Sequence, residues 1–153
     1  MDIDTILNVL VGIIIGVLIG YAGANMIQPY VEPYMFQTTL TLTVQTPSNI
    51  TSISLNSTVV LSAVLNVTLP SELSAISDTV KPYLQQNKYI ELLGKKDTDS
   101  YWSIWSTQQT TSYGECSFNI QFDTTGTYQF KVVFHGTQLL KSSESQIIIL
   151  NVT

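Results

Sequence analysis

The residues able to carry chemistry are few in this chain and lie far apart. His135 is the only histidine and Cys116 the only cysteine. A zinc site needs several such ligands, and a serine triad needs a nucleophile elbow of the G-x-S-x-G type, which the sequence lacks. We therefore expect a solvent-facing His135 and a buried, inert Cys116, with a disulfide between two copies as the alternative. We predict no enzyme: no catalytic residue, no metal and no cofactor.

Two further groups could bind a ligand. The acidic turn at 97–99 could hold calcium with nearby carbonyls, but two lysines precede it and oppose a cation. A solvated hairpin tip is the expected role. Tyr101, Trp102 and Trp105 could stack on a sugar ring, although packing on a sheet face is the expected role of these aromatic side chains.

Composition limits the classes of partner. Charged residues make up 11% of the 153 residues, the net charge is -5, and no arginine is present. Phosphate backbones and anionic lipid headgroups both need clustered cations, so we predict no nucleic-acid partner and no polybasic membrane contact. Asn-x-Ser/Thr sequons occur at four positions, which are the glycosylation candidates Asn49, Asn56, Asn66 and Asn151.

A long apolar run covers residues 6–27 and precedes the rest of the chain, which it would anchor. About 20 apolar residues cross the hydrocarbon of a bilayer as a helix, so we predict one transmembrane helix over 1–28. Small residues recur every fourth position and would lie on one helix face, where another membrane helix can approach closely. These helix-packing candidates are Gly12, Gly16, Gly20 and Ala24. They predict a homo-oligomer, or packing with other membrane helices, within a lipid bilayer.

The alternative is that this apolar run is removed as a signal peptide. The stretch 22–24 (AGA) resembles a signal-peptide cleavage site, although the acidic start and the length of the run disagree with a signal peptide. Pro29 and Pro33 end the predicted helix and indicate an extended stalk over 29–37. We place the remaining domain, 38–153, outside the cell or on a virion envelope, because the sequons and the β-rich pattern lie there.

Period-two alternation of apolar and polar residues dominates the rest of the chain. It predicts an all-β domain of about seven short strands in an antiparallel sandwich. The interval 70–87 has helical spacing instead, with Ser71 as a possible N-cap and Pro82 as the stop. A turn is expected at 94–97. The expected strands cover 39–44, 59–69, 88–93, 101–107, 115–122, 128–134 and 146–152.

The segment 123–128 (DTTGTY) makes the fold class more specific. A turn with Asp123 and Gly126 leading into a strand that opens with Tyr128 looks like the tyrosine corner of immunoglobulin-like sandwiches, with Trp102 as the expected core partner. The stretch 55–152 resembles the Ig-like domains of bacterial and archaeal surface proteins. The overall plan is similar to archaeal pilins, archaellum components and crenarchaeal virion membrane proteins.

These features predict a membrane-anchored structural or adhesive protein that oligomerises through its helix and displays an Ig-like domain, as a cell-surface protein or a virion spike. Its outer partner would be a cell-wall or host-surface protein or glycan. Two alternatives stay open. One is an archaeal pilin-like filament subunit, and the other is an archaellum-type accessory subunit that tethers to the cell wall.

Overall fold

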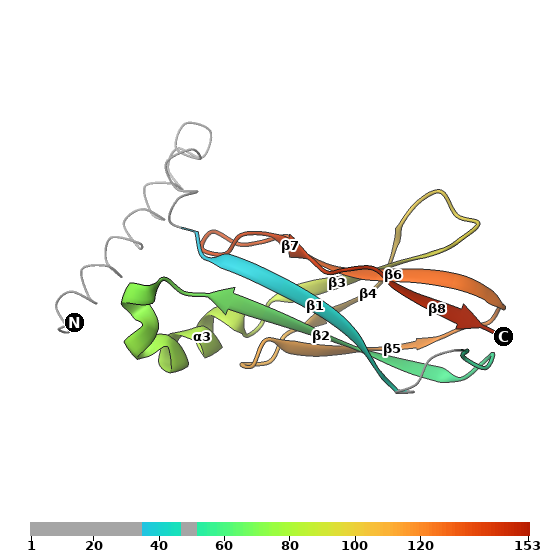
Figure 1. Ribbon diagram of the computed structural model, residues 1–153, viewed down its shortest axis with the longest axis horizontal. Helices are drawn as coiled ribbons and strands as arrows, with labels where there is room; N and C mark the ends of the chain where they lie inside the picture. The colour runs from blue at the N-terminus through green and yellow to red at the C-terminus, as the bar shows by residue number, and fades with distance from the viewer. Residues whose placement is uncertain (1–34, 47–51) are drawn as a thin grey trace.

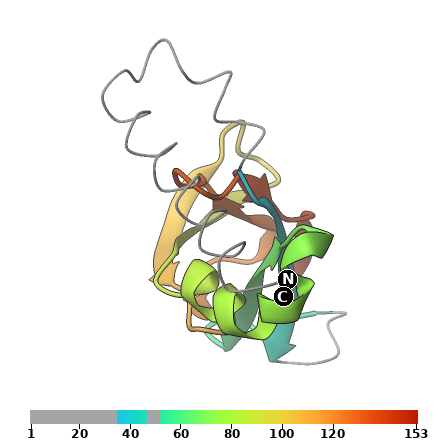
Figure 2. The same cartoon turned by 90° about the vertical axis from the view of Figure 1, so that its left-hand side faces the viewer.

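Two antiparallel β-sheets stacked face to face form the part of the chain that the computed structural model describes, residues 35–46 and 52–153. Figure 1 shows the strands running along the long axis, with helix α3 at one end and the C-terminus at the other. The view along that axis in Figure 2 shows the two layers with α3 across their near end.

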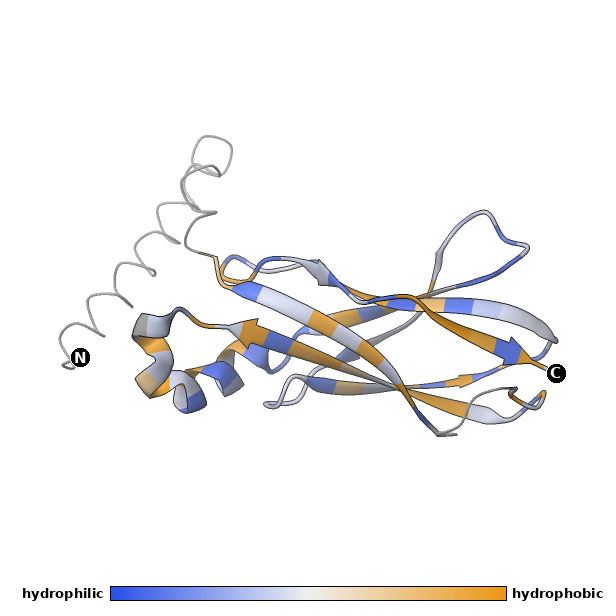
Figure 3. Cartoon of the chain, in the orientation of Figure 1, coloured by the Kyte–Doolittle hydropathy of each residue, from blue (hydrophilic) through white to orange (hydrophobic). Residues whose placement is uncertain are grey.

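The smaller sheet has the strand order β1-β2-β5, with β1 at Gln37–Thr46, β2 at Thr58–Thr68 and β5 at Glu115–Gln121. Successive side chains of a strand point to opposite faces, so the alternating sequence sends every second side chain into the core. This alternation is visible as orange and blue bands along β1 and β2 in Figure 3. The inward residues of β2 are fully buried: Val59, Leu61, Ala63, Leu65 and Val67. The strands expected over 39–44 and 59–69 from their alternation are therefore confirmed.

The larger sheet is built around β6 (Gly126–Phe134). On one side of β6 lies β3 (Tyr89–Lys96), followed by β4 (Ser103–Gln109) at the edge. On its other side lie the short β7 (Ser143–Glu144) and β8 (Ile148–Val152). Because β7 and β8 pair with the same side of β6, they are two pieces of one edge strand, and the sandwich has seven strand positions.

The order of the strands is that of an immunoglobulin-like sandwich. The first, second and fifth strands form one sheet, and the third, sixth and last form the other, with the fourth beside the third. Side chains from both sheets meet in one hydrophobic core. The predicted antiparallel, Ig-like β-sandwich is confirmed for the described residues.

Helical structure crosses from the first sheet to the second, as the spacing over 70–87 predicts. It consists of a 3-10 helix, Ser71–Ile76, followed by α3, Ser77–Gln85. Two details of the prediction are wrong. The capping position of the first helix is Pro70, with no side-chain cap, and Pro82 lies inside α3 instead of ending it. A proline removes one helical hydrogen bond, and the helix continues because its end is held from outside.

Thr110 holds that end. Its hydroxyl donates to the backbone carbonyl of Gln85, and the same oxygen accepts the backbone N–H of Lys88 at 2.9 Å. The last carbonyls of a helix lack internal partners, so a buried hydroxyl at this place satisfies one of them. Asn87 then leaves the helix at a φ of 56°, in the left-handed region that asparagine tolerates.

The turn predicted at 94–97 is also wrong, because β3 runs through Gly94 to Lys96. Gly94 lies opposite Phe130 of β6. A β-carbon at Gly94 would come within 2.5 Å of the Phe130 ring and 2.8 Å of the Trp105 indole nitrogen. Glycine is needed here to admit two aromatic rings against the strand, and not to turn the chain.

The start of the sandwich is fastened to the segment just before β7 by what we call the N-terminal clasp, Phe36 with residues 139–141. The Phe36 N–H donates to the Leu139 carbonyl at 2.8 Å, and the Lys141 N–H donates to the Phe36 carbonyl at 2.9 Å. The Thr38 hydroxyl lies 2.8 Å from the Lys141 carbonyl. The sandwich therefore includes Phe36 and Gln37, two residues that the sequence places in the stalk.

A second parallel contact lies at the opposite end of the same edge. The Ile53 N–H donates to the Asn151 carbonyl, and the Thr153 N–H donates to the Ile53 carbonyl, both at 2.8 Å. Between these two ends, the Gln146 side-chain amide donates to the Leu42 carbonyl of β1 at 3.1 Å. The edge formed by β7 and β8 is thus covered along much of its length.

Candidate functional site

The outer face of the larger sheet, from β4 across β3 and β6 to β8, carries exposed apolar side chains among charged and polar ones. Tyr89 of β3, Ile104 of β4 and Ile149 of β8 are exposed by 64%, 61% and 60%. The inner face of this sheet is already buried, so its outer face is expected to be polar. Large apolar side chains exposed on that face therefore indicate a possible binding surface. We call this surface the recognition face.

The smaller sheet presents a different outer surface. Its outward side chains are mainly Thr, Ser and Asn, and Glu115 is the one charged residue among the described outward positions of its strands. No large hydrophobic side chain exposed in the described residues belongs to β1, β2 or β5. The two faces of the sandwich therefore differ in chemistry, although both sheets contribute equally to one core.

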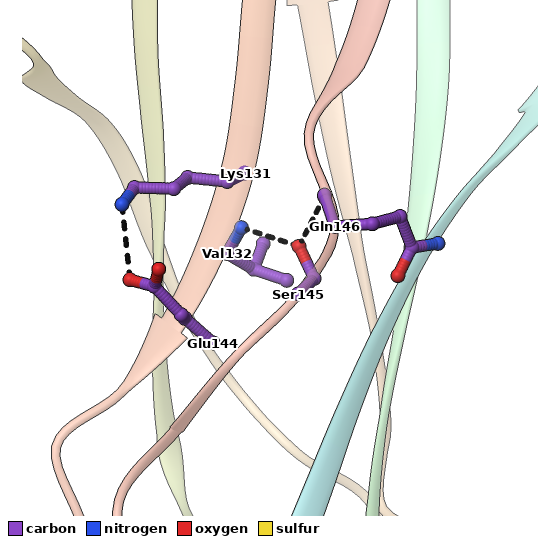
Figure 4. A network of polar contacts seen from close by, with 5 residues as sticks. All are labelled: Lys131, Val132, Glu144, Ser145 and Gln146. Atoms are coloured by element: carbon purple, nitrogen blue, oxygen red, sulfur yellow. Dashed lines mark hydrogen bonds and ion pairs between the residues drawn. The ribbon is translucent and has the colours of Figure 1, made fainter.

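Two lysines lie over the Trp102 ring and give the recognition face its positive charge. The ammonium groups of Lys95 and Lys131 lie 5.3 Å and 5.2 Å from the centre of the indole ring, which is a cation–π distance. Lys131 also donates to Glu144 at 2.9 Å, as Figure 4 shows. In the described part of the chain Lys95 has no carboxylate partner within salt-bridge distance. One positive charge is thus neutralised and one is available beside the ring.

Ser145 explains why the edge strand next to this face is interrupted. Its hydroxyl accepts the Val132 N–H at 3.0 Å and donates to the Gln146 carbonyl at 2.9 Å (Figure 4). A side chain therefore satisfies a backbone donor of β6 at the point where β7 ends. The break turns the following residues outward, and Ile147 is 50% exposed there.

The tyrosine of the predicted corner makes the expected type of contact. The Tyr128 hydroxyl lies 3.0 Å from the Thr124 carbonyl, to which it donates, and 2.7 Å from the Thr124 hydroxyl. A tyrosine at the start of the sixth strand that bonds to the backbone just upstream has the geometry of a tyrosine corner. Gly126 has a φ of 143° in this turn, and Asp123 is exposed.

Trp105, and not the predicted Trp102, contacts the aromatic side chains of the core, although its own side chain is 37% exposed. The Trp105 ring lies 4.9 Å from Phe130 at 90°, and 5.9 Å and 6.1 Å from Tyr128 and Phe122. The cause is a β-bulge: Leu92 pairs with Ser106, whereas Leu93 pairs with Ile104. The extra residue, Trp105, breaks the alternation and re-aims its side chain inward.

The polar candidates are engaged in local structure. Asp99 accepts the Lys96 N–H at 3.1 Å, and Asp97 accepts the Gln129 amide at 2.8 Å, so both carboxylates stabilise the hairpin tip. His135 is solvent-facing as predicted and lies 2.8 Å from Glu91. Within residues 35–46 and 52–153, no group of three His, Cys, Asp or Glu side chains lies close enough to hold a metal ion.

Cys116 is buried, as predicted, against the core of β5. Burial raises the pKa of its thiol from 9.0 to about 11. The reactive thiolate is therefore scarce at neutral pH.

Three glycosylation candidates have exposed side chains, and these are Asn56, Asn66 and Asn151. Asn151 accepts a hydrogen bond from the Thr127 hydroxyl at 3.1 Å. Asn49 lies outside the described residues, as do the predicted membrane helix and its packing positions Gly12, Gly16, Gly20 and Ala24. In the part that is described, no helix has the length and hydropathy of a membrane span.

Comparison with known proteins gives only general likenesses of fold. No protein-family model and no curated protein sequence matches the chain. A superoxide reductase (neelaredoxin) from Ignicoccus hospitalis is 9% identical with a TM-score of 0.45, over 80% of this chain and 98% of that one. A putative superoxide reductase from Thermotoga maritima is 8% identical with a TM-score of 0.45, over 81% and 90%.

A human fibronectin type III domain is 17% identical with a TM-score of 0.41, over 78% of this chain and 73% of that one. No activity follows from likenesses at this level. The strand order and the packing described above are what define the domain as an Ig-like β-sandwich.

Proposed function

We propose that the chain is a membrane-anchored structural or adhesive protein that displays its Ig-like domain at a cell surface or on a virion. The apolar run at 6–27, with its four-residue ladder of small side chains, supports the anchor. The sequons and the uncharged polar surface of the smaller sheet support an external location. Display of several copies together would raise the strength of weak individual contacts.

The observation that carries the adhesive role is the difference between the two sheet faces. Exposed apolar residues with a tryptophan and lysines gather on the larger sheet, whereas the smaller sheet presents hydroxyl and amide groups. A partner protein or glycan gains most from covering apolar and aromatic surface. We assign adhesion to the recognition face for this reason.

Location is tested on intact cells or particles that carry the full chain. External protease should release peptides from 35–153, while the 6–27 segment stays in the membrane pellet after alkaline carbonate extraction. A chain found in the medium with a mature start near residue 25 would contradict the anchor. Electron microscopy of the same sample should show isolated projections. Helical filaments would replace the adhesive role with the pilin-like alternative.

The adhesive face is tested with a pair of matched double variants. Ile104→Lys with Ile149→Lys should reduce retention of the particles on immobilised cell envelope. Thr41→Lys with Thr43→Lys adds the same charge to exposed positions of the smaller sheet and should leave retention unchanged. Equal loss in both would show that charge, and not the recognition face, governs adhesion.

A further inference from the structure

The outer edge of β4 is a strand edge without a partner in the described part of the chain. In residues 35–46 and 52–153, β4 pairs with β3 alone. Natural proteins usually protect such an edge with lysine, proline or a bulge, because unpaired backbone groups invite another strand. The Trp105 bulge interrupts only part of β4, and the rest, 106–109, is Ser-Thr-Gln-Gln.

The direction of the backbone groups follows from the ladder. Both backbone groups of Thr110 point toward the chain leading into β3, because its N–H donates to the Lys88 carbonyl at 2.9 Å and its carbonyl accepts the Asn87 N–H at 2.8 Å. Hydrogen-bonded and non-hydrogen-bonded pairs alternate along antiparallel strands. Thr107 lies three positions before Thr110 in this register, so its pair with Glu91 is of the opposite, non-hydrogen-bonded type. The N–H and carbonyl of Thr107 therefore point away from β3, toward the outer edge.

The strand suits a second copy of itself. No residue of β4 is charged, and none is proline or glycine. Two antiparallel copies would therefore oppose no like charges, which is the main electrostatic obstacle to pairing identical strands. The free edge of the other sheet, β5, begins with Glu115, and the β7–β8 edge is already covered by the N-terminal clasp and Gln146.

We propose that two copies of this chain join edge to edge through β4, on a two-fold axis at Thr107, and that they do so from facing membranes. The axis lets each Thr107 N–H donate to the carbonyl of the other copy. Because the strands are antiparallel, the two sandwiches point in opposite directions. Strand β1 begins at one end of the long axis (Figure 1), so the β1 strands of the two copies begin at opposite ends of the pair.

This inference rests on the membrane anchor of the proposed function, and it adds a contact between two copies of the chain at the strand edge beside the recognition face. The test uses the full chain reconstituted into two populations of phosphatidylcholine vesicles with different fluorescent labels. Flotation of the protein with lipid reports the anchor, and energy transfer between the labels reports clustering. We expect clustering when both populations carry protein and none when one population is bare.

Two variants address the edge directly. Thr107→Pro removes the outward N–H without removing a β3 bond, and Thr107→Lys opposes two like charges across the axis. Each should raise the protein density needed for half-maximal clustering by about tenfold or more, the change in equilibrium constant expected from losing roughly 1.4 kcal/mol per contact. Thr41→Lys, on the exposed face of the other sheet, is the matched control and should cluster like the unaltered chain. Thermal unfolding verifies that each variant is folded.

Each result decides the matter. Clustering that persists in both Thr107 variants, or that needs protein on one population only, would overturn the β4 pairing. Floating vesicles that stay dispersed would overturn it too, while leaving the membrane anchor intact. Protein that fails to float would contradict the anchor instead. Sedimentation of that same protein would then test the pairing without the membrane. A monomer would contradict the pairing, and a dimer that is lost in the Thr107 variants would support it.

Discussion

Burial changes the chemistry of single residues in this domain, and Cys116 is the example. The Cys116 thiol has its pKa raised to about 11 because burial disfavours the charged thiolate. The folded state therefore holds this proton at a pH where the unfolded chain has released it. The resulting stabilisation is fully present below pH 9.0 and is lost as the pH rises toward about 11.

Cys116→Ala should remove this alkaline loss. Urea unfolding of both proteins between neutral pH and pH 11 measures the effect as the difference between the two stability curves, in which other titrating groups cancel. We expect the unaltered chain to lose stability relative to the variant above pH 9.0. Parallel curves would show that the thiol titrates alike in both states. Slow reaction of Cys116 with a thiol reagent in the folded state is the accompanying control.

Tyr128 connects the start of β6 to the preceding turn through its hydroxyl. Tyr128→Phe keeps the ring among its aromatic neighbours and removes only the hydrogen bond to the Thr124 carbonyl. The free energy of unfolding should fall by about 1 kcal/mol, the usual net value of one such bond. Thr124→Ala keeps the carbonyl and should cost less. An equal cost would mean that the side-chain contact at 2.7 Å carries the effect.

At the scale of elements, the bulge in β4 decides which tryptophan stabilises the core. Trp105→Ala should lower the free energy of unfolding by about 1–3 kcal/mol, since it removes ring contacts with Phe130 and Phe122 from a side chain that is 37% exposed. Trp102→Ala should cost less, about 1 kcal/mol, because the half-buried Trp102 ring contacts two lysine ammonium groups and none of the core aromatic rings. Chemical denaturation of the pair measures this contrast, and the reverse order would refute the assignment.

The sequence predicts the elements better than their details, for physical reasons. Alternation alone is enough to assign the buried faces of β1, β2 and β5, since each has one wet side and one dry side. The extra residue in β4 leaves no mark in the pattern, so the sequence names Trp102, and not Trp105, as the partner of the core. Gly94 reads as a turn because the rings that require it come from other strands. Pro82 and Thr110 likewise depend on a contact between segments 25 residues apart.

The recognition face illustrates the same limit. Exposed apolar residues on β3, β4 and β8 become one surface only when the strand order is known, and the order is set by pairings distant in sequence. The aromatic residues Tyr101 and Trp102 are predicted as a possible patch from their proximity in the chain. Lys131 and Ile149 could not be added to it, because no local signal links β6 and β8 to β4.

Considered as a whole, the molecule depends little on charge. The ion pairs within the described residues are Lys131 with Glu144 and His135 with Glu91, and both are at the surface. Exposed pairs contribute at most about 1 kcal/mol each, so acidification should remove little stability.

We therefore expect the free energy of unfolding to fall by about 2 kcal/mol or less between pH 7 and roughly pH 3. Thermal or urea unfolding across that range measures it. Lys131→Met, which abolishes one pair, should flatten the curve slightly and serves as the reference. A steep collapse in acid would reveal buried carboxylate interactions that the described residues do not show.

The N-terminal clasp determines how the domain would respond to mechanical force. Any traction on the chain ahead of residue 35 meets Phe36 first, where hydrogen bonds join it to the segment just before β7. Those bonds and the β1–β2 ladder lie across the strand direction, so a pull along β1 shears them all at once and does not unzip them singly. Tension from a membrane would be shared by both layers before any strand slips.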